Sequence, residues 1–461
     1  GAESAQATFS ITVNDKPVIA TNSALTVNED ATGTILNNGY LASTDADDAN
    51  ASLIYTITDA TDQGTLRNGG TALGAGNTFT QQNIDNGDVT YNHAGGTTDD
   101  AFKFTVKDDG GATTAEATFT ITINDKPVIE RNTGYTVNEG SSGNTIFQTT
   151  HLSFTDADDA NNTLIYTVTV QTDQGTLYLD DDLDGYEAGE ELENSDTFTQ
   201  QNLIDEKVKY DHGGGTTDDD FKFTVQDDGG ATTAEFTFDI TVNDKPVSER
   251  NTGITVNEAS SGNTIFQTTH LSYTDADDDD TTLTYTVTVQ TTQGTLYLDG
   301  DLDGYDAGEE LENDDTFTQQ NLIDEKIKYD HGGGIADDGF TFTVEDDGGA
   351  TTDPATFTIT INDKPDESAN TGTTVNEDSV DNVITSAELA YTDADDDNTS
   401  LLYTVKVVPT NGTLQNVGAD LGVGSTFTQQ DINDGDINYD HDGSETTSDA
   451  FTFTVKDDDN R

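Results

Sequence analysis

The sequence lacks three residue types altogether and has few basic residues. Its 461 residues include no cysteine, methionine or tryptophan, and only 17 basic residues stand against 90 acidic ones. Without cysteine, the fold has no disulfide. The formal net charge of −73 excludes nucleic acid as a natural partner, because the phosphate backbone would be repelled, and it disfavours anionic membranes. No run of about 18 apolar residues occurs, so we expect no membrane insertion in this segment.

So much negative charge must be neutralised. Divalent cations can bind at specific sites, or the acidic surface can be solvated in high salt. The aspartates are clustered in short motifs. This clustering favours bound cations, although both conditions can hold together.

Helical periodicity is almost absent. Apolar residues instead alternate with Thr and Asp, as in 53–58 and 102–106. Such period-two runs, separated by Gly, Asp and Asn turns, are typical of all-β sandwiches. We therefore expect an all-β fold with about seven strands per unit.

The tetrapeptide Asn-Asp-Lys-Pro occurs four times, each time after a strand-like run. The copies are Asn14–Pro17, Asn124–Pro127, Asn243–Pro246 and Asn362–Pro365, at intervals of about 110 to 120 residues. Because proline fixes φ and cannot continue a central strand, we interpret the tetrapeptide as a linker between domains. The predicted units are 16–125, 126–244, 245–363 and 364–461.

The two ends of the sequence complement each other. Residues 1–15 resemble the last strand of a preceding unit, and the fourth unit stops before its own last strand. The chain is therefore expected to be one period of a longer assembly. Either it continues covalently into further periods, or separate subunits donate Gly1–Val13 to an open fourth unit, as in donor-strand β-augmentation. An arbitrary boundary is the third explanation.

The most specific local motif is Asp-x-Asp-x-Asp-Gly-x5-Glu, in the second and third units. In this calcium-loop pattern alternate carboxylates face inward, glycine permits a sharp turn, position seven offers a carbonyl and the last glutamate can bind with both oxygens. These oxygen ligands suit Ca²⁺ better than zinc or copper. The alternative is a solvated acidic hairpin tip. The expected ligands are Asp180, Asp182, Asp184, Tyr186 and Glu191, and Asp299, Asp301, Asp303, Tyr305 and Glu310.

Ordered blocks in all four units resemble known tandem repeats. Thr-Asp-Ala-Asp, Phe-x-Val-x-Asp-Asp-Gly-Gly and Ile-Thr-Ile-Asn-Asp-Lys-Pro, in this order, resemble cadherin repeats. Tyr439–Gly443 and Thr446–Val455 look more like the chondroitin sulfate proteoglycan (CSPG) repeat, a cadherin-like relative. The resemblance implies four tandem cadherin-like (Ig-like) Greek-key β-sandwiches in a linear rod, with Ca²⁺ at the joints.

The resemblance also implies a ligand set for each joint. The first linker would use Asn14, Asp15, Asp45, Asp47 and Asp108. The joint between the first and second units would use Glu29, Asp99 or Asp100, Asn124, Asp125, Asp156, Asp158 and Asp227. The next joint would use Glu139, Asp218, Asn243, Asp244, Asp275, Asp277 and Asp346. The last would use Glu258, Asp337, Asn362, Asp363, Asp393, Asp395 and Asp457.

The linkers depart from the cadherin pattern. They carry fewer acidic ligands, and a lysine stands where another ligand would be, so we expect fewer than three ions per joint. The alternative is that these are ordinary acidic turn residues. The lysines are Lys16, Lys126, Lys245 and Lys364.

One histidine per unit follows a tyrosine, at His93, His212, His331 and His441. Because no cysteine or second histidine stands nearby, we interpret these residues as packing at strand ends rather than as metal ligands or catalysts. No unit carries a unique polar constellation, so an enzyme is not expected.

We therefore expect a structural subunit or segment of an extracellular, cell-surface filament or adhesin stalk that Ca²⁺ stiffens. Its partners would be identical subunits or adjoining repeats, end to end, and strand complementation is one way of joining them. The alternative is a cell–cell or ligand-binding adhesion module. The near-identical repeats favour a bacterial or archaeal origin.

Overall fold

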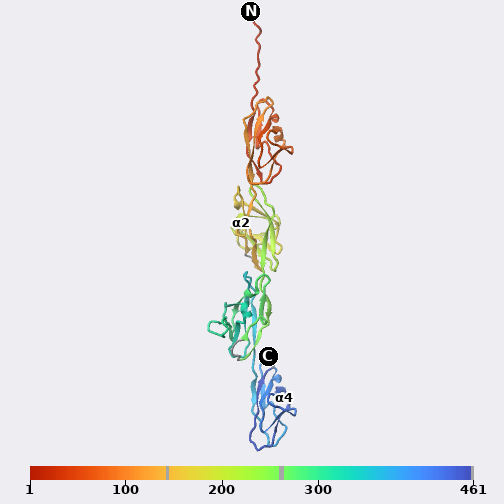
Figure 1. Ribbon diagram of the computed structural model, residues 1–461, viewed down its shortest axis with the longest axis vertical. Coiled ribbons are helices and arrows are strands. Elements are labelled where there is room, and N and C mark those ends of the chain that lie inside the picture. Colours follow the sequence, from red (N-terminus) through yellow and green to blue (C-terminus); the bar gives the residue numbers. More distant parts are fainter. Residues whose placement is uncertain (142–144, 259–263, 458–461) are drawn as a thin grey trace. The chain divides into compact units, whose positions relative to one another are not determined.

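The structure is a computed structural model that describes residues 1–141, 145–258 and 264–457. Strands dominate these residues, and each α-helix in them has five or six residues (Figure 1). The chain forms two compact units, Gly1–Asn243 and Asp244–Arg461, and each contains two copies of one arrangement of strands. The all-β prediction is confirmed, with more and shorter strands per copy than expected.

The copies are named repeats 1 to 4 and are defined by their elements. Repeat 1 contains β1 Val18–Asn22, β2 Leu25–Asn28, β3 Thr34–Ile35, β4 Leu41–Thr44, the 3-10 helix η1 Asn50–Ser52, β5 Ile54–Asp59, β6 Gly64–Asn68, β7 Thr71–Ala72, β8 Thr78–Thr80, α1 Gln81–Asp85, β9 Val89–His93, β10 Asp100–Lys107 and β11 Ala117–Asn124. Repeat 2 contains β12 Val128–Asn132, β13 Tyr135–Asn138, β14 Thr145–Ile146, β15 Leu152–Thr155, η2 Asn161–Thr163, β16 Ile165–Val170, β17 Gly175–Leu179, β18 Thr197–Thr199, α2 Gln200–Ile204, β19 Val208–His212, β20 Asp219–Gln226 and β21 Phe236–Asn243.

The second compact unit follows the same order of elements. Repeat 3 contains β22 Val247–Asn251, β23 Ile254–Asn257, β24 Thr264–Ile265, β25 Leu271–Thr274, η3 Asp280–Thr282, β26 Thr284–Val289, β27 Gly294–Leu298, β28 Thr316–Thr318, α3 Gln319–Ile323, β29 Ile327–His331, β30 Asp338–Glu345 and β31 Ala355–Asn362. Repeat 4 contains β32 Asp366–Asn370, β33 Asn382–Val383, β34 Leu389–Thr392, η4 Asn398–Ser400, β35 Leu402–Val407, β36 Gly412–Asn416, β37 Ala419–Asp420, β38 Thr426–Thr428, α4 Gln429–Asp434, β39 Ile437–His441 and β40 Thr452–Lys456.

Repeat 1 shows how the strands build the sandwich. Its five-stranded sheet has the order β2-β11-β10-β5-β8, in which only β2 and β11 run parallel, and a second sheet has the order β3-β9-β6-β7. The alternation read from the sequence holds in β10, where Phe102, Phe104 and Val106 are buried and the residues between them are more exposed. Phe102 stacks on Phe119 of β11 at 5.2 Å between ring centroids. The core therefore lies between the two sheets.

Repeat 4 differs from the other three in its larger sheet. Repeats 2 and 3 have the five-stranded orders β13-β21-β20-β16-β18 and β23-β31-β30-β26-β28. In repeat 4 the corresponding sheet has three strands, β38-β35-β40. Within the described part of the chain, β40 pairs only with β35, and residues 371–376, which correspond to β2, form no strand.

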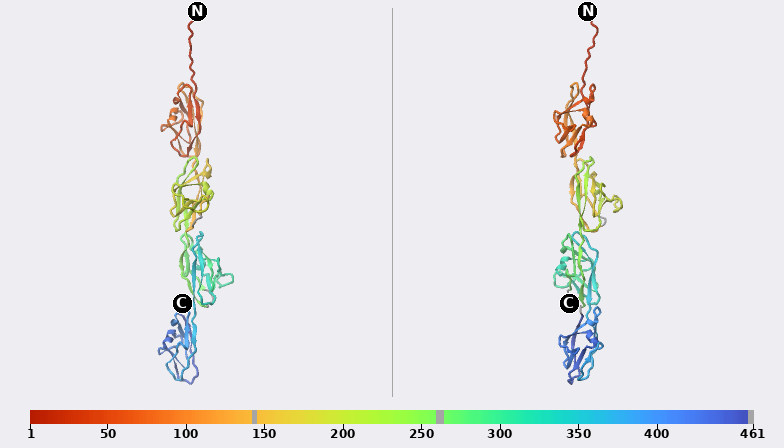
Figure 2. Two further views of the ribbon diagram at one scale, coloured as in Figure 1. Left: turned by 180° about the vertical axis from the view of Figure 1, so that it is seen from behind. Right: turned by 90° about the vertical axis from the view of Figure 1, so that its right-hand side faces the viewer.

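The segment that precedes β1 is extended and exposed. Residues 1–17 form no strand, and residues 1–13 run away from the body of repeat 1 (dark red in Figures 1 and 2). Phe9, Ile11 and Val13 are 88%, 77% and 71% exposed. That this segment completes another repeat stays a prediction.

The short helices were missed from the sequence because their signal is capping rather than periodicity. In α1 the Thr80 side chain accepts the N–H of Asn83, and the Asn83 side chain accepts the N–H of Thr80. This reciprocal pair satisfies two N–H groups at the start of the helix. The predicted packing of histidines at strand ends is confirmed for His93, His212 and His331, which end β9, β19 and β29 and are buried.

Candidate cation sites at the linkers and loops

The linker between repeats 1 and 2 begins at the last residue of β11. Because β11 pairs with β2, the Asn124 carbonyl accepts the N–H of Glu29 at 2.9 Å. The Asn124 side chain turns the other way and donates from Nδ2 to Asp227 Oδ2 at 3.0 Å. The next N–H, of Asp125, donates to Asp158 Oδ1 at 3.3 Å. The linker therefore contacts one repeat through its backbone and the other through two aspartates.

Carboxylates crowd around this linker. Burial raises the pKa of Asp125, and the charges of Glu29, Asp156 and Asp99 raise it further. Burial also raises the pKa of Asp158 to about 6, together with its contacts to Asp156. These shifts mean that several negative groups repel one another in a partly dehydrated space, which is the environment that a bound cation relieves.

Several oxygens at this joint are buried and accept no hydrogen bond from the described residues. They are Asp125 Oδ1, Asp156 Oδ2 and Asp159 Oδ2. Asp125 is only 8% exposed. Buried charged oxygens are costly unless paired or bound to a metal. The set consists of hard oxygen donors, so the residues present fit Ca²⁺.

The structure distinguishes between Asp99 and Asp100, the two candidate ligands that repeat 1 offers to this joint. Asp99 Oδ1 accepts the N–H of Ile123 next to the linker, and its charge raises the pKa of Asp125. Asp100 instead accepts the Tyr91 hydroxyl at 2.7 Å and the backbone N–H groups of Asp62 and Gln63. Asp99 therefore lies at the joint, whereas Asp100 stabilises the fold of repeat 1 through hydrogen bonds within that repeat.

The first linker repeats this geometry. Asn14 Nδ2 donates to Asp108 Oδ2 at 3.0 Å, and the N–H of Asp15 donates to Asp47 Oδ1 at 3.1 Å. Burial is also the main cause that raises the pKa of Asp47. Asp45 Oδ2 and Asp48 Oδ2 are buried and lack a hydrogen-bond partner in the described chain.

Glycine is required beside the linker asparagines. A Cβ on Gly229 would lie 1.9 Å from Asn124 Oδ1, and a Cβ on Gly110 would lie 1.9 Å from Asn14 Oδ1. The Asp-Asp-Gly-Gly block of the sequence thus supplies an aspartate for the asparagine amide and the space that the asparagine needs.

The joint between repeats 3 and 4 lies within the second compact unit. Asn362 Nδ2 donates to Asp457 Oδ2 at 3.1 Å, and the N–H of Asp363 donates to Asp395 Oδ1 at 3.3 Å. Asp337 Oδ1 accepts the N–H of Ile361, as Asp99 does for Ile123.

An acidic group lies on the repeat 4 side of this joint. The ligand atoms of Asp393, Asp396 and Asp457 lie within 4.8 Å of one another. Asp457 is 6% exposed, and its Oδ1 is buried without a hydrogen bond from the described residues. The cluster therefore has a buried oxygen available for a cation.

Linker lysines form ion pairs with some of the carboxylates that surround the linkers. Lys364 Nζ lies 2.9 Å from Glu258 Oε1, and this contact is the main cause that lowers the pKa of Glu258. Lys126 Nζ lies 2.7 Å from Asp30 Oδ2. The lysine of each of these two linkers thus neutralises one carboxylate of the lower repeat.

The predicted ligands of the middle joint are divided between the two compact units. In the first unit the Asn243 carbonyl accepts the N–H of Glu139, and Asp218 Oδ1 accepts the N–H of Val242. In the second unit the N–H of Asp244 donates to Asp277 Oδ1 at 3.3 Å. There, Asp275 Oδ1 accepts the N–H of Asp277, and Asp346 Oδ1 accepts the N–H of Ala350.

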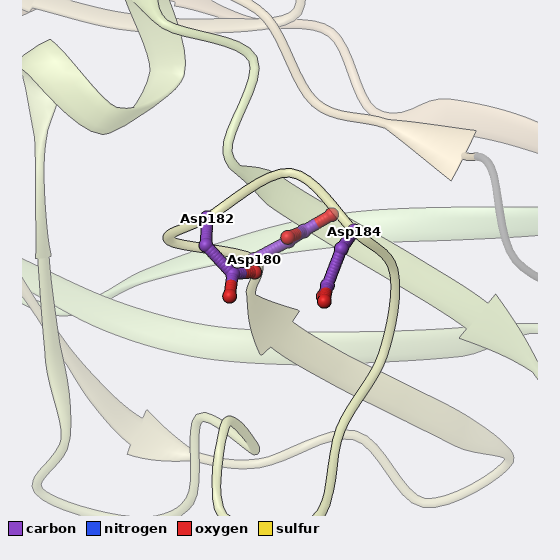
Figure 3. Close-up of side chains that lie close together, drawn as sticks. All are labelled: Asp180, Asp182 and Asp184. Atoms are coloured by element: carbon purple, nitrogen blue, oxygen red, sulfur yellow. The ribbon is translucent and has the colours of Figure 1, made fainter.

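The two acidic loops form a second class of candidate site. In repeat 2 the loop follows β17, and the ligand atoms of Asp180, Asp182 and Asp184 lie within 4.8 Å of one another (Figure 3). Asp299, Asp301 and Asp303 form the same cluster after β27 in repeat 3. Both loops project from their repeats, near residues 180 and 300 in the colours of Figure 2.

The buried aspartate of each loop forms an ion pair with a lysine. Asp180 is fully buried and its Oδ2 pairs with Lys209 Nζ of β19, as Asp299 pairs with Lys328 of β29. Burial raises the pKa of Asp180, but Lys209 and the backbone N–H groups of Leu183 and Gly185 together outweigh burial, so the net pKa is lowered. Asp180 Oδ1 and Asp299 Oδ1 are buried and accept no hydrogen bond from the described chain. One oxygen therefore binds the lysine while the other is available for a cation.

The predicted glutamate of each loop lies outside the three-aspartate cluster, and the hydroxyl of the predicted tyrosine contacts that glutamate. The Tyr186 hydroxyl donates to Glu191, and Glu191 also accepts the N–H of Gly189 at 2.7 Å. Tyr305 and Glu310 form the same pair. Glu191 and Glu310 would have to leave these hydrogen bonds to bind a cation with both oxygens.

Sequence reasoning missed the third aspartate of Asp-Ala-Asp-Asp. The second aspartate of each motif accepts the linker N–H, whereas Asp48, Asp159 and Asp278 have a buried oxygen without a hydrogen-bond partner among described residues. In repeat 4 the third aspartate, Asp396, belongs to the acidic cluster. The signal was present, because all four motifs carry this residue.

Comparisons with known proteins agree with the repeat pattern. A family model described as "Cadherin-like" matches residues 17–123, 127–242, 246–361 and 365–461. Human "Extracellular matrix organizing protein FRAS1" is 29% identical over 471 residues, which cover 96% of this chain and 11% of that protein. "Extracellular matrix protein 3" of Lytechinus variegatus is 31% identical over 396 residues, which cover 82% of this chain and 12% of that protein.

These relatives place the protein outside the cell. The chain spans only about a tenth of the length of the curated relatives it matches. Both relatives are animal proteins, so they lend no support to the expected bacterial or archaeal origin.

Among solved structures, an I-band fragment from titin is similar to this chain, with 8% identity and a TM-score of 0.30. The superposition covers 75% of this chain and 98% of the fragment. No described helix is long and apolar enough to cross a membrane.

Proposed function

The chain belongs to the cadherin-like family, and from this premise we propose that it is a structural, non-enzymatic segment of an extracellular filament or stalk whose joints are stiffened by Ca²⁺. The observation that carries this proposal is the set of buried carboxylate oxygens without hydrogen-bond partners among the described residues at the linkers, such as Asp125 Oδ1 and Asp363 Oδ1. The same arrangement recurs at three linkers of one chain, which is expected if each linker has the same task.

The residues that would hold the ion at the joint of repeats 1 and 2 are Glu29, Asp99, Asp125, Asp156, Asp159 and Asp227. A bound Ca²⁺ would replace repulsion among these carboxylates with shared coordination. The chain itself contributes the alignment, because Asn124 and the N–H of Asp125 already fix Asp227 and Asp158. The lysine contacts at Asp30 and Glu258 leave fewer carboxylates for calcium, which supports a low number of ions per joint.

The acidic loops of repeats 2 and 3 are proposed as additional Ca²⁺ sites. Asp180, Asp182 and Asp184 already lie together, and Asp180 Oδ1 is buried and available. These loops project from the repeats rather than joining them. Calcium there would stabilise a hairpin of one repeat and would have little effect on the linker.

The test is calcium binding measured by isothermal titration calorimetry on the full chain at low salt. The wild type should bind several ions, and Asp159→Asn should bind fewer ions without losing the fold. Asp239→Asn is the matched control, because Asp239 is exposed on the outer face of β21 and should leave binding unchanged. A wild type that binds no Ca²⁺, or an Asp159 variant that binds as many ions as the control, would refute the proposal.

We further propose that such segments are joined end to end by strand complementation. The exposed alternating segment before β1 and the three-stranded sheet of repeat 4 support this.

A further inference from the structure

A buried lysine accompanies the acidic loop in both repeats that have the loop. In repeat 2 it is Lys209 of β19, and in repeat 3 it is Lys328 of β29. Repeats 1 and 4 have a short hairpin in place of the loop, and the same strand position holds the neutral Thr90 and Asn438. The loop and the lysine therefore occur together in this sequence.

The loop shields this lysine from water. Lys209 pairs with Tyr178 in the ladder of β17 and β19, and Tyr186 of the loop packs against Tyr178 with 5.3 Å between ring centroids. Lys209 is 8% exposed, and Tyr178 and Asp180 are fully buried. The Lys209 ammonium contacts Asp180 Oδ2 in this shielded place. Because little water screens the pair, charges interact more strongly here than on the surface.

The other oxygen of Asp180 is the buried end of the three-aspartate cluster. Asp180 Oδ1 is buried and accepts no hydrogen bond from the described residues. The other two members, Asp182 and Asp184, are exposed, and contact with Asp182 raises the pKa of Asp184 (Figure 3). An ion held by the cluster would therefore share the Asp180 carboxylate with the lysine ammonium.

Two cations on one carboxylate repel each other. Calcium loops tune their affinity by the number of ligand charges, and Lys209 offsets one of the three carboxylates of its loop. We propose, on the basis of the proposed Ca²⁺ sites in the loops, that Lys209 and Lys328 are tethered cations that weaken Ca²⁺ binding there. The loops then keep their fold without calcium and fill only at the higher Ca²⁺ concentrations that extracellular modules bind.

The last ligand position of the loop agrees with weak binding. Glu191 accepts the Tyr186 hydroxyl and the N–H of Gly189, and Glu310 has the corresponding partners in repeat 3. In a calcium loop the glutamate at this position binds the ion with both oxygens. Ca²⁺ would have to displace these hydrogen bonds or bind without the glutamate, and either case lowers the affinity.

The test is native-state hydrogen exchange of the full chain, read at β17 and β27 by mass spectrometry over a range of CaCl₂ concentrations. The two strands report on the two loops separately, so each chain carries its own reference. In the wild type, protection of both strands should rise with a midpoint on the order of 0.1–1 mM. In Lys209→Gln the midpoint at β17 should fall by at least about tenfold, because glutamine can donate to Asp180 without a positive charge. The midpoint at β27 should not move.

Two further variants separate the charge of the lysine from its packing. Lys209→Arg keeps the charge and should keep the weak binding of the wild type. Lys207→Gln is the matched control, because Lys207 pairs with the exposed Asp181 rather than with Asp180. It removes the same charge two residues away and should leave the midpoint at β17 close to that of the wild type. In EDTA, β17 should stay protected in the wild type and lose protection in Lys209→Gln.

The outcomes separate the role of the lysines from calcium binding itself. A midpoint at β17 that is unchanged or higher in Lys209→Gln would overturn the role proposed for the lysines, whereas the loops would still be Ca²⁺ sites. An equal fall in Lys207→Gln would also overturn that role, since a charge away from Asp180 would then have the same effect. Protection of β17 and β27 that does not respond to Ca²⁺ in any variant would overturn the loops as Ca²⁺ sites, and the role of the lysines with them.

Discussion

The buried pair of Lys209 and Asp180 gives the sharpest prediction about the loops. Asp180 is fully buried and the Lys209 side chain is 11% exposed. Lys209→Met would leave the carboxylate with backbone N–H donors alone, such as that of Gly185 at 3.2 Å from Oδ2. Removing one partner of a buried ion pair typically costs ~3–5 kcal/mol, because the other charge stays buried. We expect a loss of this size in EDTA, confined to repeat 2.

Calcium should recover part of that loss. A ligand at about 100 times its dissociation constant stabilises the state that binds it by about 2.7 kcal/mol. The assay is native-state hydrogen exchange of β17 and β19, with the Lys328–Asp299 pair of repeat 3 as an internal reference. The double variant Asp180→Asn with Lys209→Met should lose much less stability in EDTA and should show no recovery in calcium. A single variant that loses less than about 1 kcal/mol, or a double variant that behaves like the single one, would refute the reasoning.

Three further predictions concern the fold. Gly64→Ala should destabilise repeat 1 by roughly 1–3 kcal/mol in calorimetry, because its Cβ would lie 2.2 Å from the Tyr91 hydroxyl oxygen, whereas Gly74→Ala, with its nearest atom at 3.7 Å, should be near neutral. Thr80→Ala should cost about 1 kcal/mol in urea unfolding through the lost cap of α1, and an equal loss in Thr78→Ala would argue against capping. Burial raises the pKa of Asp449, but the N–H groups of Thr410, Asn411 and Ala450 and the Tyr439 hydroxyl together outweigh burial, so the net pKa is lowered. The ionised Asp449 carboxylate therefore stabilises the folded state at pH values above its ordinary pKa of 3.8, and this stabilisation is lost as the pH falls through its lower pKa in the folded state. The acid unfolding of repeat 4 should therefore become less steep in Asp449→Asn, and an unchanged profile would count against it.

The fold could be predicted because its determinants are local and periodic. Alternating residues such as Phe102, Phe104 and Val106 mark buried strands without any tertiary information. The linkers were visible because proline and the repeat interval mark them. The short helices depend on a two-residue capping contact, as between Thr80 and Asn83, which leaves no periodic trace.

The candidate sites were only partly predictable because carboxylates of one motif point in different directions. Asp99 and Asp100 are neighbours in sequence, yet one lies at the linker and the other accepts the Tyr91 hydroxyl. Asp158 and Asp159 likewise divide into an acceptor for the linker N–H and a buried oxygen without a described partner. The pairing of Lys209 with Asp180 joins residues that are 29 positions apart, and no local pattern indicates it.

The central claim is that Ca²⁺ stabilises the linkers, and thermal unfolding of the full chain with and without a chelator tests it most directly. The measurement is made at low salt, with Mg²⁺ and added NaCl as controls for charge screening. We predict that EDTA lowers the melting temperature and that Ca²⁺ restores it more effectively than Mg²⁺ or NaCl does. An equal melting temperature in EDTA and Ca²⁺ at low salt would contradict the account.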